Sequence, residues 1–191
     1  MAATGFSSRE NIGWLGGPGG GTPSPMSDIT QAILEEHEWF RRRFADLDGV
    51  RDGADLAILW RVLAGRLEIH ADAEEEIFYP ELLHKGDHAV DETEDAIGDH
   101  DDIRAAVRST LALTAGSDAW WEAVRAARKA NSDHMAEEER GALADFRRNV
   151  DPERRERLGH RFTVRLAART RIDADLSEHG PKPDQYIAAH R

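Results

Sequence analysis

The chain contains no cysteine. Disulfides, thiolate clusters, zinc knuckles and thiol nucleophiles are therefore excluded, and any bound metal must take nitrogen and oxygen ligands. The sequence also lacks an apolar run long enough to cross a membrane, and its N-terminus lacks the basic and then apolar pattern of a signal peptide. We expect a cytoplasmic protein without a membrane anchor.

Basic residues are scarce relative to acidic ones. The chain has 25 Lys and Arg residues against 37 Asp and Glu residues, which gives a formal net charge of -12. An acidic surface of this kind repels nucleic acid and anionic membranes, so neither is an expected partner. A length of 191 residues suits one compact domain with additional segments at its ends.

Composition divides the chain into three parts. Residues 1–26 include a stretch rich in glycine and proline, which cannot bury enough apolar surface to offset its ordering entropy, and they are predicted to form a flexible tail. Residues 27–150 are predicted to form a bundle of helices. Residues 151–191 are predicted to be a C-terminal extension that consists of a helix and a polar tail.

The central part predicts an all-α fold. Four stretches rich in Ala, Leu, Glu and Arg, at 28–48, 54–83, 90–114 and 117–148, are separated by short turns that contain Gly or Asp. Ser27 or Asp28 can cap the first helix, and Ser117 can cap the fourth. Short connections make neighbouring helices antiparallel, so we expect an up-down-up-down four-helix bundle.

A fifth helix is predicted from Pro152 to about Thr170, because Asp151-Pro152 ends the fourth. It is rich in Arg and Glu and has few apolar residues, which favours a solvated or packing appendage over a helix that binds a partner.

Four histidines occur one to a predicted helix, at His37, His70, His100 and His134. The second and fourth helices add a glutamate four residues later, Glu74 and Glu138. Residues at i and i+4 project from the same face, so each of these helices presents a nitrogen and a carboxylate in one direction. Apolar residues share the faces of the first three histidines, which indicates that these histidines point into the core.

The pattern repeats within the chain. His100 follows His37 by 63 residues, and His134 and Glu138 follow His70 and Glu74 by 64. Two helix pairs of like design are implied. A site made from two such pairs suits two metal ions bridged by carboxylates, and histidine with carboxylate suits iron or manganese in a bundle core.

With these motifs, the sequence resembles the hemerythrin or HHE cation-binding family over about residues 28 to 148. The resemblance implies a non-haem di-iron centre, with an oxo or hydroxo bridge, that meets dioxygen, peroxide or nitric oxide or senses iron. The ligands that it implies are His37, His70, Glu74, His100, His134 and Glu138.

One position departs from the family pattern. The oxygen carriers of the family have a second histidine four residues after the one on the third helix, and this chain has Arg104 there. A guanidinium cannot ligate a metal, but Arg104 shares the inward side with His100 and could pair a carboxylate or attract an anionic ligand. The alternative, that Arg104 extends outward to solvent, is favoured.

Several nearby residues are given lesser roles. Glu137 is a possible outer partner of a ligand or a substitute ligand, whereas Glu75, Glu76 and Glu139 are expected to point away and solvate the bundle. Tyr79 follows His70 by nine residues, on the opposite side of a regular helix, unless Pro80 distorts the turn. His84 and His88 are expected at the surface. Packing roles are expected for four tryptophans, Trp39, Trp60, Trp120 and Trp121.

The leading functional hypothesis is redox chemistry at a di-iron centre, with hydrogen peroxide, dioxygen or nitric oxide as the small ligand, in an oxidative-stress response. Catalase-like or peroxidase-like activity is one form of it. The alternative is a non-enzymatic oxygen carrier or an iron or oxygen sensor. Nitrogen and carboxylate ligands also leave zinc or manganese open.

Overall fold

The computed structural model describes residues 27–168 and 180–191, and no strand occurs in these two ranges. The regular elements are α1 (Ile29–Gly49), α2 (Gly53–Ala73), a π-helical turn η2 (Glu74–Phe78), α3 (Tyr79–Lys85), α4 (Ala89–Ser109), α5 (Asp118–Arg140), α6 (Ala142–Asn149), α7 (Pro152–Ala168) and α8 (Pro183–His190). The predicted tail at residues 1–26 lies outside the described residues, as does the segment 169–179.

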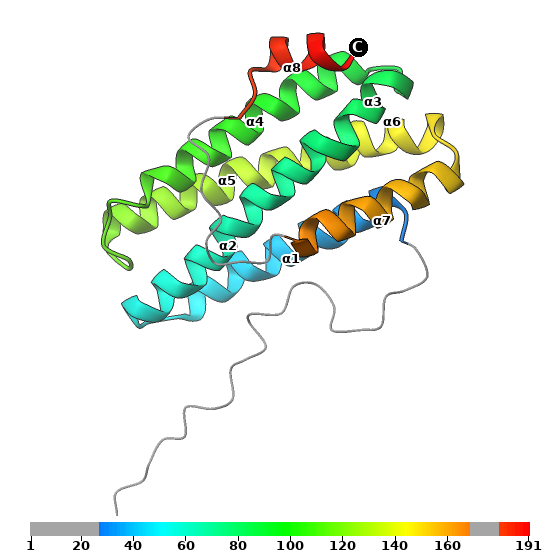
Figure 1. The fold of residues 1–191 in the computed structure, drawn as a ribbon. Coiled ribbons are helices and arrows are strands. Elements are labelled where there is room, and N and C mark those ends of the chain that lie inside the picture. Colours follow the sequence, from blue (N-terminus) through cyan, green and yellow to red (C-terminus); the bar gives the residue numbers. More distant parts are fainter. Residues whose placement is uncertain (1–26, 169–179) are drawn as a thin grey trace, which may run out of the picture.

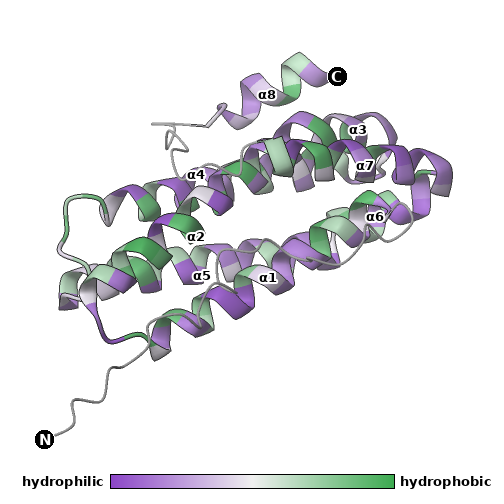
Figure 2. Cartoon of the chain, turned by 60° about the horizontal axis from the view of Figure 1, so that its bottom comes forward, coloured by the Kyte–Doolittle hydropathy of each residue, from purple (hydrophilic) through white to green (hydrophobic). Residues whose placement is uncertain are grey.

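The predicted helical bundle is confirmed. Its four long members are α1, the continuous run α2–η2–α3, α4, and the run α5–α6 (Figure 1). Figure 2 shows apolar and polar residues alternating along these helices, as expected where one face of each helix meets the core. None of the helices among the described residues is long and apolar enough to span a membrane.

The helix ends follow local hydrogen bonding. Asp28, one of the two predicted caps, accepts from the backbone N–H of Thr30 at 2.8 Å, and Ser117 accepts from that of Trp120 at 3.2 Å. The third predicted helix, 90–114, corresponds to α4, which ends at Ser109, earlier than predicted. At this end Thr110 leaves the helical pattern, donating its hydroxyl to the Val107 carbonyl at 2.7 Å and accepting from the Trp60 indole at 2.7 Å.

The core is divided along the bundle into two groups of apolar side chains. One surrounds Phe40, Trp60 and Trp120 at the end of the α1–α2 turn, and the other surrounds Phe78, Phe146 and Phe162 towards the opposite end. His37 and His100 lie in sequence where α1 and α4 pass from one group to the other. On α4, for example, Ile97 belongs to one group and Ile103 to the other, with His100 between them. Polar side chains therefore gather at mid-bundle.

The C-terminal extension packs onto the bundle. The predicted fifth helix is α7, which ends at Ala168 and lies beside α1, with Leu158, Phe162 and Leu166 buried (Figure 1). The predicted polar tail also forms a helix, α8, which lies on α4 and buries Tyr186 and Ile187. The sequence prediction missed α8 because a helix of eight residues is too short to show a period, and Pro183 begins it.

Gly159 on α7 permits close packing against the start of α1. A Cβ at this position would clash with the Ser27 carbonyl oxygen and lie 2.8 Å from the Ile29 backbone nitrogen, and backbone atoms cannot move aside as a side chain can. We therefore expect Gly159→Ala to lower the free energy of unfolding by about 1–3 kcal/mol. This loss would outweigh the higher intrinsic helix propensity of alanine over glycine. Urea unfolding of both proteins measures the change. A variant as stable as the parent would contradict this packing.

Candidate metal centre

The four histidines meet in two pairs inside the bundle. The rings of His37 and His70, from α1 and α2, have centroids 5.3 Å apart, and those of His100 and His134, from α4 and α5, have centroids 4.6 Å apart. The Nε2 atoms of the second pair are 3.2 Å apart. All four side chains are at most 3 % exposed. The four long helices therefore bring these side chains together inside the bundle.

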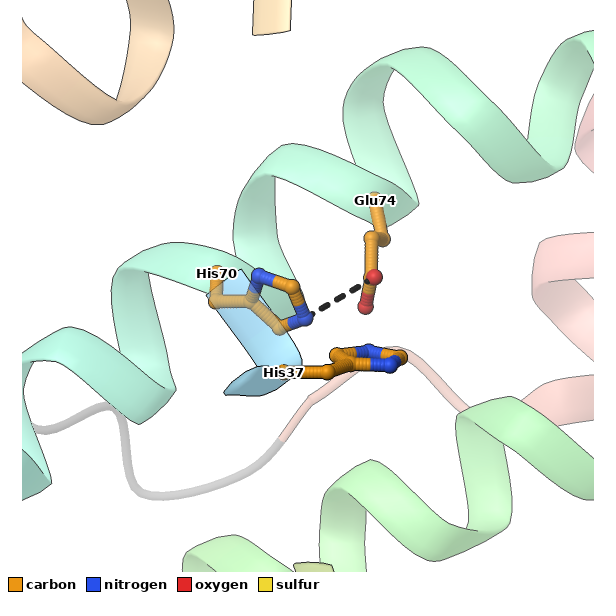
Figure 3. Close-up of side chains that lie close together, drawn as sticks. All are labelled: His37, His70 and Glu74. Carbon is orange, nitrogen blue, oxygen red and sulfur yellow. Dashed lines mark ion pairs between the residues drawn. The ribbon is translucent and has the colours of Figure 1, made fainter. Parts of the chain in front are cut away.

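Glu74 lies between the two pairs. Its Oε1 is 2.9 Å from His70 Nε2, and its Oε2 is 3.3 Å from His100 Nε2 and 4.0 Å from His134 Nε2. Figure 3 shows the rings of His37 and His70 next to this carboxylate. Two groups, His37–His70–Glu74 and Glu74–His100–His134, each have candidate ligand atoms within 4.8 Å of one another. Glu74 is thus the one carboxylate common to both groups.

Glu138 approaches the site from the fourth long helix, on the side of His37. Its Oε2 is 3.2 Å from His37 Nε2, and its Oε1 accepts a hydrogen bond from the Tyr79 hydroxyl at 2.8 Å. The side chain is 4 % exposed. All six residues that the sequence singled out are therefore buried and adjacent, although Glu138 lies outside the two tightest groups.

Several of the facing atoms have no hydrogen-bond partner. They are His37 Nε2, His70 Nδ1, His70 Nε2, both oxygens of Glu74 and Glu138 Oε2. Distances near 3 Å separate some of them, but their angles do not make hydrogen bonds. Each buried polar atom left unsatisfied costs about 1–3 kcal/mol, and bound cations would satisfy those that face the centre, although not His70 Nδ1 on the far side of its ring. This set of imidazole and carboxylate donors fits a metal ion such as iron, manganese or zinc.

Carboxylates also hold the outer nitrogens of His37 and His100. Glu139 Oε1 is 2.9 Å from His37 Nδ1, and Glu75 Oε1 is 2.8 Å from His100 Nδ1. A proton on Nδ1 that points to a carboxylate leaves the lone pair of Nε2 directed at the centre, as in histidines that bind metals. The expectation that Glu75 and Glu139 only solvate the bundle is therefore wrong. The expectation for Glu76 holds, since it is exposed and pairs with Arg165.

The electrostatics of the cluster match its geometry. Burial lowers the pKa of His37, but the nearby carboxylates of Glu138 and Glu139 outweigh burial and raise it to about 9. Burial likewise lowers the pKa of His100, and Glu74 and Glu75 outweigh it and raise it to about 9. Burial raises the pKa of the Glu74 carboxyl, but His70 and His100 hold it well below its usual range. At neutral pH the metal-free cluster therefore holds Glu74 as a carboxylate and His37 and His100 in the protonated form, so binding of a cation would release protons from these two rings.

Arg104 points inward, so the favoured expectation that it extends to solvent is wrong. It is 3 % exposed and donates to Glu68 at 3.1 Å, to Glu75 at 2.9 Å and to Asp72 at 3.4 Å. The attraction of these carboxylates explains the orientation, because three acidic side chains of the α2–η2 run surround the guanidinium. Arg104 thus holds Glu75, which in turn holds His100.

A small cavity adjoins the histidines. Its volume is about 10 Å³, room for about one water molecule, and its polar lining consists of His70, His100, His134, Glu68, Arg104 and Asn131. Apolar side chains, including Leu67 and Ile103, form the rest of its wall. The lining therefore combines three candidate ligands, His70, His100 and His134, with the ion pair of Arg104 and Glu68 around a space for about one water molecule.

Tyr79 lies on the same side as the cluster, which corrects the expectation for a regular helix. The π-helical turn η2 between His70 and Tyr79 holds about one residue more than an α-helical turn, which rotates the following residues by about 100°. The hydroxyl of Tyr79 reaches Glu138 as a result. Burial, together with Glu138 and Glu74, raises the pKa of Tyr79 well above its usual value, so it remains a donor rather than a tyrosinate ligand.

The remaining candidates take surface or packing positions. Glu137, the possible outer partner or substitute ligand, is exposed and lines a surface pocket together with His134 and Glu138. His84 and His88 are exposed, as expected. Trp39, Trp60 and Trp120 are buried packing residues, as expected, and Trp121 is partly buried against the same core group.

The family described as hemerythrin HHE cation binding domain matches residues 28–145. No curated protein and no solved structure gave a match. The matched region covers more than half of the chain and contains the four histidines, Glu74 and Glu138. From this match, and from a helical bundle that gathers those side chains at its centre, the chain belongs to the hemerythrin HHE cation-binding family.

Proposed function

We propose that His37, His70, Glu74, His100, His134 and Glu138 hold two iron ions and that this centre reacts with hydrogen peroxide or binds dioxygen or nitric oxide in an oxidative-stress response. The observation that carries the proposal is the position of Glu74, whose two oxygens face different histidine pairs at 2.9 and 3.3 Å. A carboxylate between two sets of nitrogen donors suits a bridged pair of metal ions.

Bound iron would supply the electrons for such chemistry, and the protein supplies a dry, preorganised cage. The cavity beside the histidines is about 10 Å³, which favours ligands as small as peroxide, dioxygen or nitric oxide over organic hydroperoxides. Because Arg104 stands where the family's oxygen carriers have a further histidine, the donor set is one nitrogen smaller, which favours reaction over carriage.

The test is iron analysis with ultraviolet-visible spectra of protein produced in iron-supplemented medium, before and after peroxide is added. We expect about two irons per chain, charge-transfer bands that change with peroxide, and peroxide consumption that falls in a folded His100→Ala variant. Protein without iron that consumes peroxide at the full rate would refute the proposal. Metal analysis of the same sample distinguishes iron from zinc or manganese.

A second candidate function is non-enzymatic, as an oxygen carrier or as an iron or oxygen sensor. The sensor form is favoured by the C-terminal extension, which contacts both sides of the site. The Phe162 ring of α7 lies 5.9 Å from that of His70, and the Tyr186 hydroxyl of α8 donates to the Glu75 carbonyl. Protease cleavage of α8 that depends on iron, without peroxide turnover, would favour the sensor. Identical cleavage with and without iron would count against it.

Glu139 offers a milder test of the ligand set. Its hydrogen bond with His37 Nδ1 orients the ring, and that bond lowers the pKa of Glu139 to about 2. Partners of this kind contribute about 10- to 100-fold to metal affinity, so Glu139→Gln is expected to weaken iron binding by that factor at the His37 side only. Competitive titration with a chelator measures the change. Equal affinity in variant and parent would show that the bond does not orient a ligand.

A further inference from the structure

A second, larger pocket opens on the other side of His134. It has a volume of about 130 Å³ and lies between α4 and α5, where α6 begins. This pocket, which we name the acidic groove, is lined by Glu92, Asp95, Asp99, His134, Glu137 and Glu138, together with two alanines. Its volume is about ten times the 10–15 Å³ that one water needs, so a cation with part of its hydration shell fits within it.

The acidic groove runs from the surface to the candidate centre. Asp95 and Glu137 are exposed at its mouth, and Glu92 and Asp99 are partly buried. At its floor, His134 is 2 % and Glu138 4 % exposed. Carboxylates therefore occur at each depth between solvent and the histidines.

The floor of the groove itself indicates a ligand. Glu138 Oε2 is buried and has no hydrogen-bond partner. Asp99 Oδ2 lies 3.5 Å from His134 Nδ1, which joins the wall of the groove to a histidine of the second pair. No lysine or arginine lines the groove among the described residues. A cation can therefore pass between oxygen ligands without meeting a positive charge.

We propose that the acidic groove is the uptake route by which Fe²⁺ reaches the centre. The inference rests on the proposed function and extends it from holding iron to acquiring it. The smaller cavity does not serve the same purpose, because it has room for only about one water molecule. Iron and the small ligand thus approach the centre by different paths.

The negative charge of the acidic groove is expected to raise the rate of iron uptake. A cleft lined by charges of one sign raises the local concentration of the opposite ion and speeds association by about 10- to 1000-fold. The effect is on the rate, because the carboxylates at the mouth do not touch the final position of the metal. It is also sensitive to salt, since exposed charges are screened within about 10 Å at 0.1 M ionic strength.

The experiment measures uptake rather than activity. Metal-free full-length chain is mixed anaerobically with Fe²⁺ at low ionic strength, and unbound iron is trapped at set times with an iron-chelating dye. The groove variant carries Asp95→Asn and Glu137→Gln. The control carries Glu94→Gln and Asp133→Asn, which removes the same charge from exposed positions on the same two helices outside the groove.

We expect the groove variant to take up iron roughly 3- to 10-fold more slowly than the parent, with the same final iron content, and the control to match the parent. In 0.5 M salt the difference should shrink. Equal rates in the groove variant and the control would overturn the route while leaving the di-iron proposal standing. A lower final iron content in the groove variant would also overturn it, because these residues would then hold the metal. A parent that binds no iron would refute the proposed function itself.

Discussion

Glu74→Gln is expected to abolish iron binding at both halves of the centre at once. The two oxygens of Glu74 face His70 on one side and His100 on the other, and the side chain is fully buried. Glutamine keeps the shape but loses the charge and offers only one oxygen. Since outer partners alone account for about 10- to 100-fold in affinity, we expect a loss of more than about 100-fold here.

Iron content and thermal unfolding measure this loss. Iron that is present at 1000 times its dissociation constant stabilises a protein by about 4 kcal/mol, so the variant should no longer gain melting temperature when iron is added. Glu76→Gln is the matched control, because Glu76 lies two residues away but is exposed and pairs with Arg165. A Glu74→Gln protein that retained both irons would mean that Glu74 does not join the two sites.

The site could be predicted from sequence because its geometry follows helix periodicity. His70 and Glu74 are four residues apart, a spacing that puts both on one face of a helix. The repeat of this pattern 64 residues later at His134 and Glu138 indicated two similar halves. The apolar neighbours of the histidines fixed the inward direction. These regularities belong to local structure, and the structure places the six side chains together.

Tyr79 could not be placed in this way. A π-helical turn changes the angular position of every residue that follows it. The residues of the run Glu74–Phe78 carry no sequence signal that predicts such a turn. Three successive glutamates there have different neighbours. Glu74 faces the histidine pairs, Glu75 pairs with His100 and Arg104, and Glu76 pairs with Arg165. A wider turn also marks functional sites in other helices.

Glu139 and Glu75 were misplaced for a second reason. Both lie beside a ligand position, and a helical wheel directs such residues sideways toward the neighbouring helix rather than to the solvent. Whether a sideways carboxylate meets a histidine depends on the neighbouring helix, which only the packed bundle defines. Glu139 meets His37 of α1 and Glu75 meets His100 of α4, each across a helix interface. Contacts of this kind follow from tertiary packing and carry no sequence period.

Arg104→Leu is expected to lower the free energy of unfolding by about 3–5 kcal/mol. The guanidinium lies within 3.4 Å of carboxylates of Glu68, Asp72 and Glu75, and the side chain is 3 % exposed. Removing one partner from a buried network leaves the remaining charges uncompensated. The free-energy penalty of those charges exceeds the net stabilisation that the ion pairs contribute. Leucine fills part of the volume but neutralises none of these acids.

Urea unfolding of metal-free protein measures this change without a contribution from bound iron. Arg42→Leu is the control, because Arg42 is 63 % exposed and pairs with Glu38 one turn before it, an arrangement worth at most about 0.5 kcal/mol. Arg104→Lys should fall between the two, since lysine keeps the charge but not the forked geometry that reaches several carboxylates. A loss below about 1 kcal/mol in Arg104→Leu would mean that the acids are solvated without Arg104. Unchanged peroxide kinetics in a folded, iron-loaded Arg104→Leu protein would limit Arg104 to this structural role, because the charge on the cavity wall would then not affect the ligand.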